Sequence, residues 1–203
     1  MAVITVSREL GSFGTAIAEQ VAARLSTVCV DKEVLAEMAR QAGVAVEVMV
    51  EAEERLLSRP LVVSEEMRSF FAGQDRKQSG RLDEQSFITQ MAEAIRTLAG
   101  RGNIVFVGRG AQLILAQDPQ ALHVHIYAPL EVRAARIQQR RGLADLETAL
   151  RVVRQVDEQR SNWFRRFFQG VNWRDARHYH LMINTGRIPE AVAVSLVVQA
   201  AQA

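Results

Sequence analysis

The chain has 203 residues, 48% of them apolar, and a formal net charge of +2. This length and composition suit one domain with a full hydrophobic core, and no apolar run reaches the length of about 18 residues that a membrane span needs. The single cysteine, Cys29, excludes an intrachain disulfide and is typical of a reducing compartment, so we expect a cytoplasmic protein without a membrane partner.

The charge is unevenly placed along the chain. Residues 133–177 contain eleven arginines, no lysine and five acids, whereas the remainder has a net charge of −4. Arginine binds phosphate through two parallel hydrogen bonds and does not lose its charge. This basic block therefore predicts an anionic ligand.

The first 18 residues predict a buried strand, a glycine-bearing turn and a helix. The apolar residues 2–6 suit a strand covered on both faces, and helical spacing starts at Ala16. Backbone N–H groups of such a turn, together with a helix N-terminus, can hold phosphate. The candidate phosphate-binding residues are Arg8, Gly11, Ser12, Phe13, Gly14 and Thr15.

This turn departs from the standard P-loop motif. The spacing places Arg8 at the first glycine of that motif, Gly14 at its lysine and Thr15 at its magnesium-binding hydroxyl. The alternative is an ordinary turn whose glycines serve only the chain reversal, with Thr15 as the N-cap of the helix.

A second short strand, residues 28–30, ends in Asp31. Ligands of open α/β sheets gather at the carboxyl ends of the strands, so Asp31 is a candidate to face substrate or metal. Capping of the following helix is the alternative role for this side chain. Residues 44–100 predict a mostly helical insertion, which either closes over a small substrate or packs as plain helices.

Three more strands are predicted at residues 103–107, 123–127 and 181–183. The first is followed by Gly108-Arg109-Gly110, which places an arginine at the same sheet edge. The last is followed by Asn184 and Thr185, which add polar groups there. The order of strands and helices favours a parallel sheet with helices on both faces.

Two predicted helices carry the basic block. Residues 131–141 present Arg133, Arg136 and Arg140 on one face, where they can stabilise the charge of a phosphoryl transfer. Residues 145–169 carry several charges at similar spacing, namely Arg151, Arg154, Asp157 and Arg160. The alternative is a solvated face in which Asp157 pairs with its neighbours three residues away, Arg154 and Arg160.

Aromatic residues alternate with arginines between Trp163 and Phe168. Proteins that bind single-stranded nucleic acid show such a pattern. An amphipathic helix that buries its aromatic residues shows it more often, so we do not expect a nucleic-acid partner.

Taken in order, these segments resemble the cytidylate kinase-like family, a branch of the P-loop nucleoside monophosphate kinases. The matching segments are residues 4–18, 30–33, 107–110, 127–133, 156–160 and 183–185. The resemblance implies a P-loop NTPase-like three-layer α/β sandwich with a five-stranded parallel sheet. It also implies a single domain, residues 1–203, with a substrate-side insertion at residues 44–100 and a lid at about residues 140–148.

The resemblance further implies transfer of the terminal phosphoryl group of ATP to a nucleoside monophosphate such as CMP or dCMP, assisted by Mg²⁺. The turn from Arg8 to Thr15 then holds the ATP phosphates, with Thr15 near the metal and Arg8 in place of the missing lysine. The expected acceptor contacts are Arg109, Asp157 and Arg160, the arginines flanking the lid are Arg133, Arg136 and Arg140, and the residues near the adenine are Asn184 and Thr185.

The missing lysine leaves two alternatives open. One is a nucleotide-binding regulatory protein without turnover, and the other is a kinase of a small molecule that is not a nucleotide. The expected partners are small-molecule nucleotides, and self-association into a homodimer is compatible with the sequence.

Overall fold

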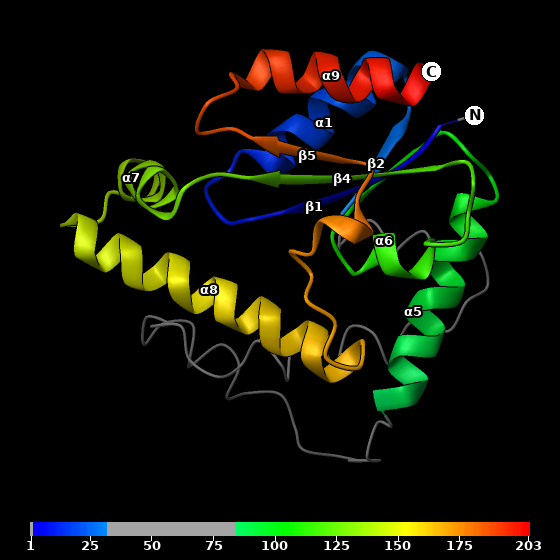
Figure 1. Ribbon diagram of the computed structural model, residues 1–203, viewed down its shortest axis with the longest axis horizontal. Coiled ribbons are helices and arrows are strands. Elements are labelled where there is room, and N and C mark those ends of the chain that lie inside the picture. The colour runs from blue at the N-terminus through cyan, green and yellow to red at the C-terminus, as the bar shows by residue number, and fades with distance from the viewer. Residues whose placement is uncertain (1, 32–83) are drawn as a thin grey trace, which may run out of the picture.

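The computed structural model describes residues 2–31 and 84–203, which form a parallel α/β sandwich (Figure 1). Its five strands lie in the order β2-β3-β1-β4-β5, and every neighbouring pair is parallel. The strands are β1 (Val3–Arg8), β2 (Val28–Val30), β3 (Ile104–Val107), β4 (Ala121–Tyr127) and β5 (Leu181–Asn184). The predicted fold class is confirmed.

Two helices, α1 (Gly14–Leu25) and α9 (Glu190–Gln202), cover one face of the sheet (Figure 1). Their buried side chains recur with helical spacing, which is why these segments are amphipathic helices. Ile17 and Val21 of α1 and Val197 of α9 pack with Ile4 and Val6 of β1. This core layer fixes the start of α1 directly above the end of β1.

The other face packs against α5 (Glu84–Ala99), α6 (Ala111–Ile114) and α8 (Leu146–Phe167). Met91, Ile95 and Phe106 are buried there, and the aromatic residues at the end of α8 pack against the same cluster. The aromatic residues between Trp163 and Phe168 thus take part in packing, as the amphipathic-helix interpretation predicts.

Helix α7 (Leu130–Arg141) packs on α8 through Ala134 and Ile137. Gly142, at a φ of 62°, ends α7, and Asp145 begins α8 by accepting a hydrogen bond from the Thr148 N–H at 2.6 Å. Residues 142–145 connect the two helices, and their role in a lid stays a prediction. The single-domain organisation also stays a prediction, and residues 44–83 of the predicted insertion lie outside the described residues.

The strand register brings three turns to one edge of the sheet. Val6 of β1 pairs with Val107 of β3, and Arg8 pairs with Ile126 of β4. The turns after β1, β3 and β4 therefore begin side by side. A short 3₁₀ helix, η1 (Ala176–His178), precedes β5.

Helix α1 starts two residues earlier than the spacing predicts. Its N-cap is Phe13, and Thr15 lies within the first turn, so the alternative of Thr15 as the N-cap is wrong. Over residues 2–31 and 84–203, none of the helices combines the length and apolar character that a bilayer crossing requires.

Candidate functional site

Two backbone carbonyl groups of the turn between β1 and α1 accept hydrogen bonds from buried side chains of the protein. The buried Ser12 hydroxyl donates to the Glu9 carbonyl at 2.8 Å and to the Ile126 carbonyl at 3.0 Å. The Ser12 carbonyl in turn accepts a hydrogen bond from the Thr185 hydroxyl at 2.9 Å. The N–H groups of the first helical residues, 14–16, have no intrahelical acceptor because they start the helix. Such groups are suited to hold an anion.

Arg8 occupies the space that a side chain at position 14 would need. A β-carbon added at Gly14 would lie 2.3 Å from the Arg8 β-carbon, so only glycine fits beside it. The Arg8 side chain passes over Gly14 and places its Nη1 against Gly108, where an added β-carbon would lie only 2.0 Å away. The Arg8 side chain thus fills the space of a side chain at position 14, and its guanidinium points towards the turn after β3.

That turn has an unusual backbone that brings Arg109 to the same edge. Gly108, Arg109 and Gly110 all have positive φ, at 82°, 60° and 67°. Glycine adopts this conformation freely, whereas an arginine there is strained by its β-carbon. Strain of this kind is typical of functional positions.

Arg8, Arg109 and Arg160 form a cationic cluster beside the start of α1. Burial lowers the pKa of Arg8 to about 9, and the positive charges of Arg160 and Arg109 act in the same direction. Asp31 opposes this shift, so its carboxylate also lies within electrostatic reach of Arg8. At that pKa the Arg8 guanidinium remains protonated at neutral pH. The sequence placed all four residues in the site, and the structure brings them together.

Arg160 is fixed by contacts on two sides. Its Nη1 donates to the Arg8 carbonyl at 2.5 Å, and its guanidinium lies 5.2 Å from the centre of the Trp173 ring. Burial lowers the pKa of Arg160, an effect that the nearby carboxylates Asp157 and Glu9 oppose.

A second group, the buried charge quartet, consists of Glu9, Arg133, Asp157 and Arg174. Arg133 donates to both carboxylate oxygens of Asp157 at 3.3 and 2.9 Å, and its Nε lies 3.0 Å from Glu9. Arg174 completes the ring of contacts, with Nε 2.8 Å from Glu9 and Nη2 2.8 Å from Asp157. Two carboxylates thus face two guanidinium groups.

The quartet explains why Asp157 does not sit on a solvated face. Asp157 is only 9% exposed and pairs with arginines from α7 and from the segment after α8, so the alternative pairing with Arg154 and Arg160 is wrong. Arg133 is 4% exposed and also donates to the carbonyls of Ala128 and Leu10. Arg133 and Asp157 therefore tie α7, α8 and the turn after β1 together.

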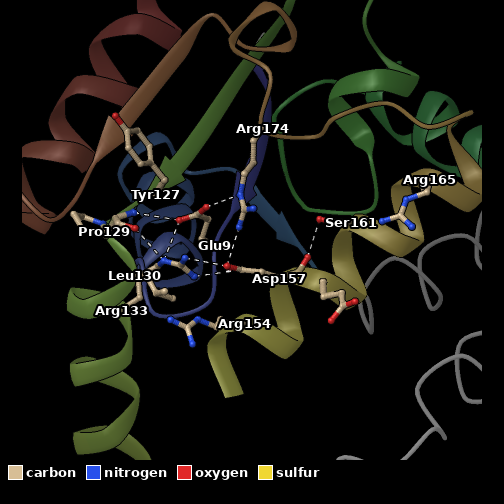
Figure 2. A pocket seen from close by; sticks show the side chains of 12 residues that line it. Glu9, Tyr127, Pro129, Leu130, Arg133, Arg154, Asp157, Ser161, Arg165 and Arg174 are labelled. Atoms are coloured by element: carbon tan, nitrogen blue, oxygen red, sulfur yellow. Dashed lines mark hydrogen bonds and ion pairs between the residues drawn. The ribbon is translucent and has the colours of Figure 1, made fainter. Parts of the chain in front are cut away.

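A cavity of about 640 Å³ opens beside the quartet (Figure 2). Figure 2 shows Glu9 between Arg133 and Arg174, with Asp157 reaching the group from α8. The cavity wall continues through Tyr127 and Pro129 at the end of β4. Because the carboxylates of Glu9 and Asp157 are already bound to guanidinium groups, neither is placed to act as a free base.

Sequence reasoning missed Glu9, Trp173 and Arg174. Glu9 lies three residues after the predicted strand of residues 2–6, inside the predicted phosphate-binding turn, and this position is the signal that points to it. Trp173 is 1% exposed and donates from Nε1 to the Ser161 hydroxyl at 3.1 Å, and the guanidinium groups of Arg160 and Arg174 lie 5.2 and 4.6 Å from its ring centre. No local pattern marks Trp173 or Arg174, because their partners lie on distant segments.

The remaining predicted arginines differ in their surroundings. Arg136 binds the Gly11 carbonyl at 3.2 Å, the Thr185 hydroxyl at 3.1 Å and the Thr185 carbonyl at 2.8 Å. Arg140, in the last turn of α7, is exposed. The Asn184 side chain accepts the Gly186 N–H at 2.9 Å, which closes the turn after β5. Arg136 and Thr185 thus join this turn to the one after β1.

The residues at the start of α1 fit a phosphate-bound magnesium ion. Magnesium in kinase sites keeps waters and substrate phosphates as ligands and takes one or two oxygens from the protein. The Thr15 side chain is exposed in the first turn of α1, and Asp31 is half-buried at the same edge. Within the described part of the chain, no group of three or more potential metal-ligating side chains occurs, so an all-protein metal cage is absent there.

A family model and known proteins match much of this chain. The model described as "Cytidylate kinase-like family" matches residues 3–187. A cytidylate kinase of Methanothrix thermoacetophila is 32% identical over 133 residues, which is 64% of this chain and 74% of that protein.

Two solved structures resemble the fold. An uncharacterized protein from Eubacterium ventriosum has a TM-score of 0.71 at 20% identity, covering 100% of this chain and 99% of the other. A shikimate kinase from Bacteroides thetaiotaomicron has a TM-score of 0.50 at 13% identity, covering 99% of this chain and 96% of the other. At these identities the likeness concerns the fold alone.

Proposed function

Because the chain belongs to the cytidylate kinase-like family, we propose that it transfers the terminal phosphoryl group of ATP to a nucleoside monophosphate, with CMP or dCMP as the first candidates. The observation that carries this proposal is the cationic cluster of Arg8, Arg109 and Arg160 next to the start of α1. One anion at the start of α1 and a second at the cluster would lie side by side, which is the arrangement that phosphoryl transfer needs.

The acceptor class follows from the charge of the cluster. Three guanidinium groups in a partly desolvated position repel one another, and this repulsion is one reason for the lowered pKa of Arg8. A phosphate dianion relieves the repulsion and accepts paired hydrogen bonds from each arginine. The acceptor therefore carries a phosphate group, and its phosphate oxygen is the nucleophile.

The donor lies on the turn between β1 and α1. The N–H groups at the start of α1 hold its phosphates, and Arg8 supplies the positive charge that lysine supplies in the standard motif. The Thr15 hydroxyl would hold Mg²⁺ together with the phosphates, and the bound ion would supply positive charge for the leaving group. Asp31 supports the metal or the acceptor from the end of β2.

The reaction needs no protein base. An oxygen of the acceptor phosphate forms a bond to the terminal phosphorus of ATP, the bond from that phosphorus to the bridging oxygen breaks, and ADP leaves. A phosphate dianion has no proton to lose, in agreement with the paired state of Glu9 and Asp157. Arg8 and Arg160 stabilise the transferring charge. Arg133 and Asp157, which the resemblance assigned to the phosphates and the acceptor, instead position α8 and its Arg160, because both are buried and bound to each other.

Two predicted arginines of α7 complete the proposal. Arg136 holds the turn between β1 and α1 in shape through the Gly11 carbonyl. Arg140 is exposed at the end of α7, next to the predicted lid at about residues 140–148, and approaches the phosphates when that segment closes. Asn184 and Thr185 lie on the donor's nucleoside side.

The experiment measures ADP release and acceptor phosphorylation with ATP, Mg²⁺ and a panel of nucleoside monophosphates. We expect turnover with CMP or dCMP that falls at least a hundredfold in Arg8→Gln, since a fixed charge at such a centre contributes roughly 3 kcal/mol to the rate. Arg151→Gln is the matched control, because Arg151 is an exposed arginine of α8 paired with Glu147.

The other outcomes separate the alternatives. ATP binding without turnover on any acceptor would support the regulatory protein, and turnover on a phosphate-free acceptor alone would contradict a nucleotide substrate. Equal rates for wild type and Arg8→Gln would refute the role of Arg8 while leaving the kinase activity intact.

A further inference from the structure

Phe13 has a strained and exposed position in the turn between β1 and α1. Its φ is 64°, in the left-handed region that bulky side chains disfavour, and it caps α1 without a side-chain hydrogen bond. Phe13 is 40% exposed, although aromatic residues of its size are usually buried. A strained backbone combined with an exposed ring points to a functional role for this side chain.

The ring is held in a defined orientation by Arg136. The Arg136 guanidinium lies 4.1 Å from the ring centre, which is cation–π geometry. Arg136 itself is fixed by its bonds to Gly11 and Thr185, so it cannot easily swing away. The ring therefore has one face supported by a fixed cation, while much of its surface remains open to solvent.

The position of the ring relates it to the donor rather than to the acceptor. Arg8 points towards Gly108 on the β3 side of β1, whereas Arg136 and Thr185 belong to α7 and to the turn after β5, on the β4 side. A nucleotide whose terminal phosphate faces Arg8 extends its nucleoside in the opposite direction along the turn. That direction leads to Phe13.

We propose that Phe13, supported by Arg136, is the platform on which the base of the donor nucleotide stacks. This inference rests on the proposed phosphotransferase function and adds the specificity of the donor side. Stacking depends on the area of the base and reads no hydrogen-bonding edge. The site therefore prefers purine over pyrimidine triphosphates and discriminates little between ATP and GTP.

The test is equilibrium binding of ATP, UTP and inorganic tripolyphosphate in the presence of Mg²⁺, with wild type, Phe13→Leu and Phe13→Gly. In wild type, ATP should bind more tightly than UTP or tripolyphosphate. Both variants should bind ATP roughly tenfold more weakly, because base–aromatic stacking is worth about 1.4 kcal/mol or more. Their affinity for tripolyphosphate should change less than about twofold.

Two variants are used because they affect the backbone differently. Leucine keeps an apolar side chain at positive φ, whereas glycine relieves the strain there. A common loss of ATP affinity therefore reports the missing ring and not a changed turn. Leu196→Ala is the matched control, since Leu196 is 37% exposed and lies on α9, outside the turn and the predicted lid.

Several results would overturn the proposal. An equal loss of affinity for ATP and for tripolyphosphate would mean that Phe13 only shapes the turn. Unchanged or tighter ATP binding would mean that the ring does not support the base. Failure of all three ligands to bind wild type would refute the proposed function as well. ATP binding and turnover that do not respond to either Phe13 variant would refute the stacking platform alone.

Discussion

Replacing Asp157 by asparagine should strongly destabilise the protein, because this carboxylate neutralises two arginines in the buried charge quartet. Asp157 contacts Arg133 at 2.9 and 3.3 Å and Arg174 at 2.8 Å. The side chain of Arg133 is only 5% exposed, so it cannot regain its hydration when the negative charge is lost. Removing one member of a buried pair costs about 3–5 kcal/mol.

We expect a cost near the lower end of that range, about 3 kcal/mol, for two reasons. The Arg174 side chain is 39% exposed and can turn towards water, and the asparagine oxygen still accepts one hydrogen bond from Arg133. Against a total stability of roughly 5–15 kcal/mol, this loss is large. It should lower the midpoint of urea unfolding by about 1 M or more.

The same helix provides the matched control. Arg151 and Glu147 of α8 also form a pair at 2.9 Å, but their side chains are 63% and 81% exposed. Glu147→Gln should cost only about 0.3–0.5 kcal/mol, because water screens this pair. If Asp157→Asn and Glu147→Gln lowered the free energy of unfolding equally, the structural role assigned to the quartet would be refuted.

Three further predictions concern Arg8 and His125, one of the two buried histidines of β4. Gly14→Lys, which restores the motif lysine, should lower activity and not raise it, because a β-carbon there lies 2.3 Å from that of Arg8 and displaces it. Gly108→Ala should raise the KM for the acceptor, because its β-carbon would lie 2.0 Å from Arg8 Nη1. His125 is 1% exposed and burial lowers its pKa to about 4, so stability is full above about pH 6.5 and falls by about 3 kcal/mol as the pH drops towards 4. Urea unfolding measured across this pH window should show that the free energy of unfolding of His125→Phe lacks this pH-dependent loss.

Each of these predictions has a result that contradicts it. Higher kcat/KM in Gly14→Lys would mean that the turn accepts a lysine and that Arg8 is not its replacement. An unchanged KM for the acceptor in Gly108→Ala would mean that Arg8 does not contact the acceptor. For His125, the sign follows because the unfolded chain binds the proton near pH 6.5 and the folded chain only near pH 4. Parallel pH profiles for wild type and His125→Phe would therefore argue against a buried neutral ring.

Much of the fold could be predicted because its signals are local. The run of β-branched residues in β1 and the four-residue spacing of Ile17 and Val21 in α1 both predict burial from neighbouring residues alone. The order of strands and helices along the chain indicates a parallel sheet. The cationic cluster was also predictable, since Arg8 ends the buried strand β1 and Arg109 is the second residue after the buried strand β3. Parallel strands bring such residues to one edge whatever the details of packing.

The buried charge quartet could not be predicted, because its members meet only in three dimensions. Glu9 and Arg174 are 165 residues apart in sequence, and neither lies in a periodic pattern. The path of Arg8 over Gly14 depends likewise on the backbone of the turn. The conformation of Phe13 runs against the usual preference for glycine at positive φ, so no propensity argument leads to it.

The proposed phosphoryl transfer is tested most directly by a crystal structure of the protein with CMP and a non-hydrolysable ATP analogue. We predict that the CMP phosphate lies within hydrogen-bonding distance, about 3 Å, of the guanidinium groups of Arg8 and Arg160. The triphosphate should lie on the N–H groups at the start of α1. A CMP phosphate held instead in the cavity beside Glu9 and Arg174, away from Arg8, would contradict the central claim.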